Sequence, residues 1–182
     1  MTEEINNKNI VLVGMMGAGK TYIGKKLAKL LAHFSYVDTD AEIEKSTGLT
    51  IPEIFEQHGE KYFRTLEANI IKEVSKNKNQ IISIGGGAFE NPENIKALKL
   101  NGLTFYLKAP AKELFSRIEN ETNRPLLNED FSQKTIEKLL RKREKNYIKA
   151  HFVIDTYQKQ AYTILNDILS EYETYVKQTT FC

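Results

Sequence analysis

Short runs of apolar residues alternate along the chain with longer stretches in which apolar residues recur at helical spacing. Five of the short runs are rich in β-branched and aromatic residues and predict strands. These runs are Ile10 to Val13, Phe34 to Val37, Gln80 to Ile84, Leu103 to Leu107 and Phe152 to Ile154. Because parallel strands need helical crossovers between them, the alternation predicts an α/β fold with a five-stranded parallel sheet flanked by helices.

Two of the longer stretches predict helices that pack on this sheet, because their apolar residues share one helix face. In Lys20 to Ala32 that face carries Ile23, Leu27, Leu30 and Leu31, and in Tyr62 to Val74 it carries Leu66, Ile70 and Ile71. The segment Glu119 to Gln133 is polar and holds Arg124 followed by Pro125, which ends the preceding helix and predicts a mobile loop.

Length and composition predict one globular domain that spans residues 1–182. A chain of 182 residues with 41% hydrophobic and 27% charged residues is typical of such a domain. The net charge of +2 gives no large field of one sign, so we expect neither nucleic acid nor a membrane as partner. No apolar run approaches the roughly 18 residues of a membrane span, and Cys182 is the only cysteine. A cytoplasmic protein without disulfides is therefore expected, and we also expect a monomer.

The strongest motif follows the first predicted strand. Residues Gly14 to Thr21 read GMMGAGKT, which matches the phosphate-binding pattern GxxxxGK[ST] at the start of a helix. Glycines let backbone N–H groups turn toward phosphate, and the helix N-terminus adds partial positive charge. Lys20 would reach the β- and γ-phosphates, and the Thr21 hydroxyl would ligate Mg²⁺. The motif predicts a nucleoside triphosphate site.

The rest of the sequence narrows the class of nucleotide-binding protein. The segment NKNQ at 77–80 lacks the Asp of a guanine-binding motif, and the strand ending at Ile84 carries no metal-binding Asp. Asp38 and Asp40 can supply the metal-side carboxylate instead, because alternation puts both on one side of an extended segment. One would serve Mg²⁺ and the other a substrate hydroxyl. A plain helix cap is the alternative for such an Asp.

From about Asn9 to Asp155 the chain resembles the shikimate kinase family. The resemblance is carried by GMMGAGKT at 14–21, DTD at 38–40, FRTLE at 63–67, GGG at 85–87, and RPLL at 124–127 followed by RxxxY at 143–147. It implies a three-layer P-loop fold with a five-stranded parallel sheet and a mobile lid at about residues 119–133. It also implies transfer of the ATP γ-phosphate to the 3-hydroxyl of shikimate.

The resemblance also implies roles for individual residues. Lys20, Asp40 and Arg124 would be catalytic, and Asp38 would hold Mg²⁺ through water. Shikimate would contact Asp40, Arg64, Gly86, Gly87 and Arg143. The nucleotide would contact Gly17, Ala18, Gly19, Lys20, Thr21, Tyr22, Arg117, Arg124 and Gln160.

Alternatives at this point are another small-acceptor kinase, for gluconate or a nucleoside monophosphate, and a nucleotide-binding protein without turnover. Arg64 and Arg143 favour a carboxylate-bearing acceptor, because a guanidinium binds a carboxylate in bidentate fashion. Ile84 departs from the family pattern, which usually has a hydroxyl-bearing residue before the glycine triplet. The resemblance therefore does not say which hydroxyl forms a hydrogen bond at that turn.

Overall fold

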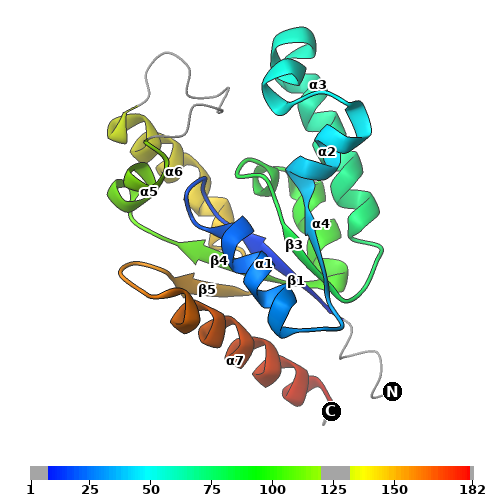
Figure 1. Ribbon diagram of the computed structural model, residues 1–182, viewed down its shortest axis with the longest axis vertical. Helices are drawn as coiled ribbons and strands as arrows, with labels where there is room; N and C mark the ends of the chain where they lie inside the picture. The colour runs from blue at the N-terminus through cyan, green and yellow to red at the C-terminus, as the bar shows by residue number, and fades with distance from the viewer. Residues whose placement is uncertain (1–7, 120–131, 181–182) are drawn as a thin grey trace.

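The structure is a computed structural model that describes residues 8–119 and 132–180, and its sheet has five parallel strands in the order β2-β3-β1-β4-β5 (Figure 1). The strands are β1 (Asn9–Val13), β2 (Ser35–Asp38), β3 (Gln80–Ser83), β4 (Gly102–Lys108) and β5 (Phe152–Asp155). Every predicted strand is confirmed to within one residue at either end. The all-parallel pairing also confirms the predicted α/β class.

Helices cover both faces of the sheet and make three layers. One face is covered by α1 (Lys20–Leu30) and α7 (Ala161–Thr180), which lie in front of the sheet in Figure 1. The other face carries α3 (Ile51–Val74), α4 (Pro92–Asn101), α6 (Gln133–Tyr147) and the short 3-10 helix η2 (Ala88–Glu90). Two further helices pack on these: α2 (Thr39–Thr47) contacts α3, and α5 (Ala111–Ile118) contacts α6. No helix in the described part of the chain is both long and apolar enough to cross a membrane.

The central strand β1 is also the point at which the direction of winding reverses. The chain places β2 and β3 on one side of β1 and then crosses to place β4 and β5 on the other. All five residues of β1 are buried, whereas the edge strands β2 and β5 are only partly covered. In sheets of this kind, ligands bind at the carboxyl ends of the strands beside such a reversal. The loop that follows β1 lies at this position.

Two details of the predicted helices differ from expectation. Leu30 is predicted on the packing face of α1 but is 59% exposed, whereas Ile23, Gly24 and Leu27 on that face are buried. Leu30 lies only about 20° around the helix from Ile23, so it belongs to the same face, but it is the last residue of α1. The helix predicted over residues 62–74 is part of α3, which starts eleven residues earlier at a capping box and kinks at Gly59.

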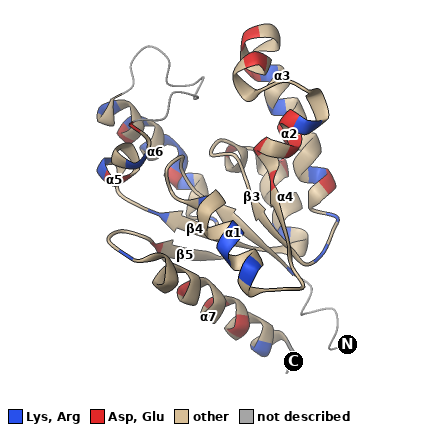
Figure 2. Cartoon of the chain, in the orientation of Figure 1, with Lys and Arg blue, Asp and Glu red and all other residues tan. Residues whose placement is uncertain are grey.

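The predicted loop at 119–133 falls largely outside the described residues, which omit 120–131. At its far end Gln133 already begins α6, and Ser132 caps this helix by accepting a hydrogen bond from the Thr135 N–H at 3.3 Å. The charged residues of the described helices are mixed in sign, and α3, α6 and α7 each carry both kinds (Figure 2).

The contact between His151 and β4 predicts how stability depends on pH. The Thr104 N–H donates to His151 Nδ1 at 3.0 Å, so this nitrogen must stay unprotonated. Burial lowers the pKa of His151 below its usual 6.5, and Lys99 and Lys8 lower it further. The unfolded chain therefore takes up the proton at a higher pH than the folded chain, and folding loses stability as the pH falls below about 6.5.

We expect the free energy of unfolding, measured with urea, to fall more between about pH 7.5 and pH 5.5 in the wild type than in His151→Asn. Asn keeps an acceptor near the Nδ1 position but does not titrate in this range. The same pH dependence in both proteins would show that His151 contributes nothing to it.

Candidate active site

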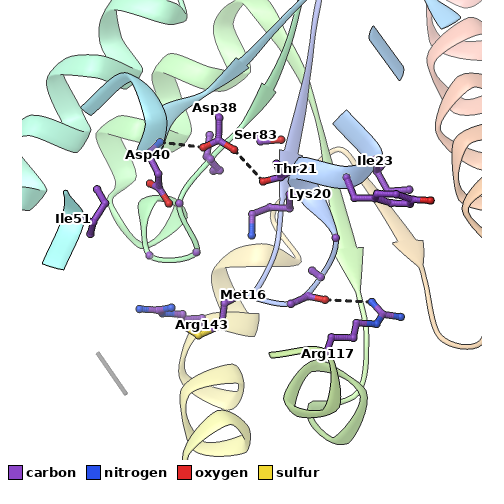
Figure 3. A pocket seen from close by; sticks show the side chains of 18 of the residues that line it. Met16, Lys20, Thr21, Ile23, Asp38, Asp40, Ile51, Ser83, Arg117 and Arg143 are labelled. Atoms are coloured by element: carbon purple, nitrogen blue, oxygen red, sulfur yellow. Dashed lines mark hydrogen bonds between the residues drawn. The ribbon is translucent and has the colours of Figure 1, made fainter. Parts of the chain in front are cut away.

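A cleft of about 690 Å³ opens at the carboxyl ends of β1, β2 and β3. It collects residues that are far apart in the sequence, from the loop before α1, the start of α2, the middle of α3, the glycine turn after β3, and helix α6. Figure 3 shows Lys20, Asp40 and Arg143 bordering one open space within it. Among the predicted site residues, the cleft is lined by Gly17, Ala18, Gly19, Lys20, Thr21, Tyr22, Asp38, Asp40, Arg64, Gly86, Gly87, Arg117 and Arg143.

The loop between β1 and α1 has the backbone that phosphate binding requires. Gly14 and Gly19 have φ values of +147° and +86°, in a region that strongly favours glycine. Gly19 is the N-cap of α1, and no capping side chain among the described residues bonds to the first turn of this helix. Its N–H groups can therefore donate to an anion. Lys20 Nζ donates to the carbonyls of Gly14 and Met15 at 2.9 and 3.0 Å, which keeps the ammonium group beside the loop.

Thr21 and Asp38 place a hydroxyl and a carboxylate side by side. Thr21 Oγ1 donates to Asp38 Oδ2 at 2.9 Å, and the Tyr36 hydroxyl donates to the same oxygen at 3.0 Å. Burial raises the pKa of Tyr36 to about 12, so its hydroxyl remains a donor at neutral pH. Hard oxygen ligands of this kind suit Mg²⁺, which binds through one or two side chains together with phosphate oxygens.

The expected placement of Asp40 on an extended segment is wrong. Strand β2 ends at Asp38, and Asp40 lies in the first turn of α2, where its N–H donates to Asp38 Oδ1 at 3.2 Å. Asp38 is thus a helix cap through one oxygen, while its other oxygen faces Thr21. Metal binding and helix capping, the two roles that the sequence allows for Asp38, are compatible because each uses a different oxygen. Helical geometry turns Asp40 toward the glycine turn.

The turn at residues 85–87 lies directly against the charged side chains of the cleft. A methyl group at Gly85 would come within 2.8 Å of Asp40 Oδ1, and one at Gly87 within 2.7 Å of the Arg64 guanidinium. Either methyl would displace a charged group from this position. Ile84 has no hydroxyl that could form a hydrogen bond at this turn. Thr39 supplies one from another segment, because its Oγ1 accepts a hydrogen bond from the Gly85 N–H at 3.2 Å. The middle residue of DTD therefore supplies the hydroxyl.

Arg64 is held by two carboxylates on its own helix. Its guanidinium donates to both oxygens of Glu67, at 3.1 and 3.0 Å, and to Glu60 at 3.0 Å. Glu67 is 2% exposed; burial raises its pKa, the ion pair with Arg64 lowers it in part, and Asp40 raises it further. The pairing fixes the direction of the Arg64 fork and leaves the guanidinium next to Gly87.

Arg143 reaches the same turn from a different helix. It is 3% exposed on α6, and its Nε donates to Glu90 Oε2 at 3.0 Å. Its Nη1 lies 3.8 Å from Met15 Sδ, and it would be 3.5 Å from a methyl group placed at Gly86. Two guanidinium groups on different helices thus flank one three-residue turn, with Asp40 beside it.

The other predicted nucleotide contacts lie around the P-loop. Arg117, on α5, donates to the Gly17 carbonyl at 3.3 Å (Figure 3), and Tyr22 lies in the first turn of α1. Gln160 does not line the cleft; its carbonyl accepts hydrogen bonds from Thr163 and Ile164 at the start of α7, while its neighbours Lys159 and Ala161 do line it. Arg124 lies outside the described residues.

Sequence reasoning assigned no role to Glu67, Glu90 or Lys159. Glu67 could have been found, since it shares the buried face of α3 with Phe63 and Ile71 and follows Arg64 by three residues. Glu90 is 53 residues from Arg143 in the sequence, and no local sequence pattern predicts that their side chains pair. Lys159 enters the cleft only because β5 brings the segment before α7 alongside the P-loop.

A family model for shikimate kinase matches residues 16–173. The chain belongs to the shikimate kinase family. A shikimate kinase from Thermodesulfovibrio yellowstonii is 45% identical over 166 residues, which cover 91% of this chain and 95% of that protein. One from Caldicellulosiruptor bescii is 46% identical over 149 residues, covering 82% and 86%. The predicted resemblance to this family, and with it an ATP-dependent kinase, is confirmed.

Solved structures agree with this membership. A shikimate kinase from Acinetobacter baumannii in complex with shikimate superposes with a TM-score of 0.88 at 38% identity and covers 96% of this chain and 98% of that one. A gluconokinase from Sinorhizobium meliloti reaches a TM-score of 0.58 at 14% identity. This second likeness shows a shared fold alone.

Proposed function

We propose that this protein transfers the γ-phosphate of ATP to the 3-hydroxyl of shikimate and releases shikimate 3-phosphate and ADP. The observation that carries the proposal is the pair of guanidinium groups, Arg64 and Arg143, on either side of the glycine turn and in one cleft with the P-loop. We further propose that residues 1–182 act as a single domain and as a cytoplasmic monomer, without a nucleic acid or membrane partner.

The acceptor would be held by its carboxylate and its hydroxyls. The planar forks of Arg64 and Arg143 can each donate two parallel hydrogen bonds to a carboxylate. Glu67 and Glu90 hold the two forks in place, and the exposed Glu60, which accepts from Arg64 Nε and Nη2, would give way to the acceptor. The backbone of Gly86 and Gly87 allows close approach of a small ring, because no side chain projects from it. Asp40 would accept a hydrogen bond from the hydroxyl that reacts.

The phosphates of ATP would bind in the loop from Gly17 to Thr21. Backbone N–H groups of Gly17, Ala18 and Gly19 would surround them, and Lys20 would exchange its carbonyl contacts for β- and γ-phosphate oxygens. Tyr22, Arg117 and, on sequence grounds, Gln160 would lie around the nucleoside. Thr21 and Asp38 would hold Mg²⁺, which when bound neutralises charge on the phosphates.

The transfer step needs little covalent chemistry from the protein. The acceptor oxygen forms a bond to the γ-phosphorus as the bond between that phosphorus and the β,γ-bridging oxygen breaks, and ADP leaves with the electron pair. The hydroxyl proton passes to Asp40, and Lys20 stabilises the charge that develops on the phosphoryl oxygens. We propose the same stabilising role for Arg124 from its motif alone, since that residue lies outside the described residues.

The proposal is tested by measuring ADP release from ATP and Mg²⁺ with shikimate, quinate, gluconate and AMP as separate acceptors. We expect turnover well above the ATP-only rate with shikimate, and little with gluconate or AMP, which do not combine a rigid ring with a single carboxylate. Turnover with another acceptor and none with shikimate would refute the acceptor assignment while leaving a P-loop kinase.

Arg64→Lys and Arg143→Lys should separate the acceptor site from the nucleotide site. Lysine keeps the charge and loses the fork, so we expect the KM for shikimate to rise by about tenfold or more and the KM for ATP to change by less than about twofold. Initial rates with each substrate varied in turn would measure both values. Equal weakening of both substrates would contradict the assignment. Arg141→Lys, an exposed residue of α6, is the control.

A further inference from the structure

Tyr147 ends the RxxxY motif, and no step of the proposed reaction uses it. It lies one helical turn after Arg143 at the end of α6, and its side chain is fully buried. Its hydroxyl donates a short hydrogen bond to the Gly86 carbonyl and lies 3.8 Å from Met15 Sδ. A single hydroxyl on α6 therefore contacts both the glycine turn and the loop that binds phosphate.

The surroundings of Gly86 show what this hydrogen bond maintains. A methyl group on Gly86 would be 3.5 Å from the Met16 nitrogen, 3.7 Å from the Gly14 oxygen and 3.5 Å from Arg143 Nη1. The turn is thus packed between the P-loop and Arg143, and its carbonyl points to the buried end of α6. Burial raises the pKa of Tyr147 well above its usual value, so the hydroxyl keeps its proton and stays a donor.

We propose that Tyr147 is a positioning residue for the acceptor: its hydroxyl fixes the Gly86 carbonyl and thereby sets the orientation of the glycine turn and of Arg143 against the P-loop. This inference rests on the proposed function, because the acceptor is taken to bind at that turn. Without the hydroxyl, the part-buried Gly86 carbonyl would have no donor among the described residues, and the peptide would be expected to rotate toward one. Rotation would turn the neighbouring N–H groups away from the acceptor.

A neighbouring tyrosine provides a matched control. The ring of Tyr106, on β4, lies 5.1 Å from the ring of Tyr147, and it is 1% exposed in the same core. Its hydroxyl has no hydrogen-bond partner among the described residues. Tyr106→Phe and Tyr147→Phe therefore delete the same atom from adjacent rings, but only the second deletion breaks a hydrogen bond to the glycine turn.

The test is steady-state kinetics of the full-length wild type, Tyr147→Phe and Tyr106→Phe with shikimate and ATP each varied. In Tyr147→Phe we expect the KM for shikimate to rise by about tenfold and the KM for ATP to stay within about twofold. Tyr106→Phe should leave both within about twofold of the wild type. A residue with a merely structural role would lower thermal stability without this split between the two substrates.

Two outcomes would overturn the inference: an unchanged KM for shikimate in Tyr147→Phe, or an equal rise in both KM values. A wild type that does not phosphorylate shikimate would instead refute the proposed function, so the two failures are distinguishable. The folded wild type gives a second readout if Tyr147→Phe does not fold. With ¹³C-labelled tyrosine, saturating shikimate should shift the Cζ resonance of Tyr147 more than that of Tyr106, and equal or absent shifts would overturn the inference.

Discussion

Lys20→Met is expected to lower kcat by about 100-fold or more, because it removes the P-loop cation that would meet the β- and γ-phosphates. Charge on these oxygens redistributes in the transition state, so the loss should fall mainly on kcat. The fold should persist, since Lys20 lines the cleft and is only partly buried, and its ammonium group donates to two backbone carbonyls, those of Gly14 and Met15. Rapid measurement of ADP formation at saturating substrates would give kcat.

Lys25→Met is the matched control for this prediction, since it makes the same change at an exposed position of the same helix. It should leave kcat within about twofold of the wild type. If Lys20→Met retained a near-normal kcat while remaining folded, another group would have to neutralise the phosphates, and the P-loop assignment of Lys20 would be wrong.

Asp40→Asn is expected to lower kcat by about 100-fold or more with a smaller change in the KM for shikimate. The amide is nearly the same size and can occupy the same place beside Gly85, but it cannot take the hydroxyl proton. The reacting oxygen would then attack as a neutral alcohol that has lost its orienting carboxylate. The measurement is kcat at saturating ATP, Mg²⁺ and shikimate.

Asp38→Asn tests whether Asp38 and Asp40, which lie two residues apart, have different roles. Asp38 faces Thr21 and the proposed metal, so its amide variant should need more Mg²⁺ for half-maximal rate, whereas Asp40→Asn should keep the wild-type Mg²⁺ dependence. A shift in Mg²⁺ dependence in Asp40→Asn, with normal kcat at high Mg²⁺, would show that their roles are reversed.

The sequence by itself determined the strands, the class of fold and the chemical groups of the cleft. Strands such as Ile10 to Val13 are recognisable because burial demands continuous apolar residues, which is a local property of the chain. The P-loop is recognisable for a similar reason, since its glycines, Lys20 and Thr21 all lie within eight consecutive residues. Leu30 belongs to the apolar stripe of α1 and is nevertheless exposed, because periodicity gives the direction of a side chain around a helix but not how far along the helix the packing contact extends.

Only the tertiary structure decided how those groups face one another. The direction of the Asp40 side chain depends on the residue at which β2 ends and α2 begins. If this boundary moves by one residue, the side chain points in a different direction. The pairs of Arg143 with Glu90, Thr39 with Gly85 and Tyr147 with Gly86 join residues 46 to 61 positions apart. Such contacts follow from strand order and helix packing, which are set by the burial of the whole core, and no local pattern of residues encodes them.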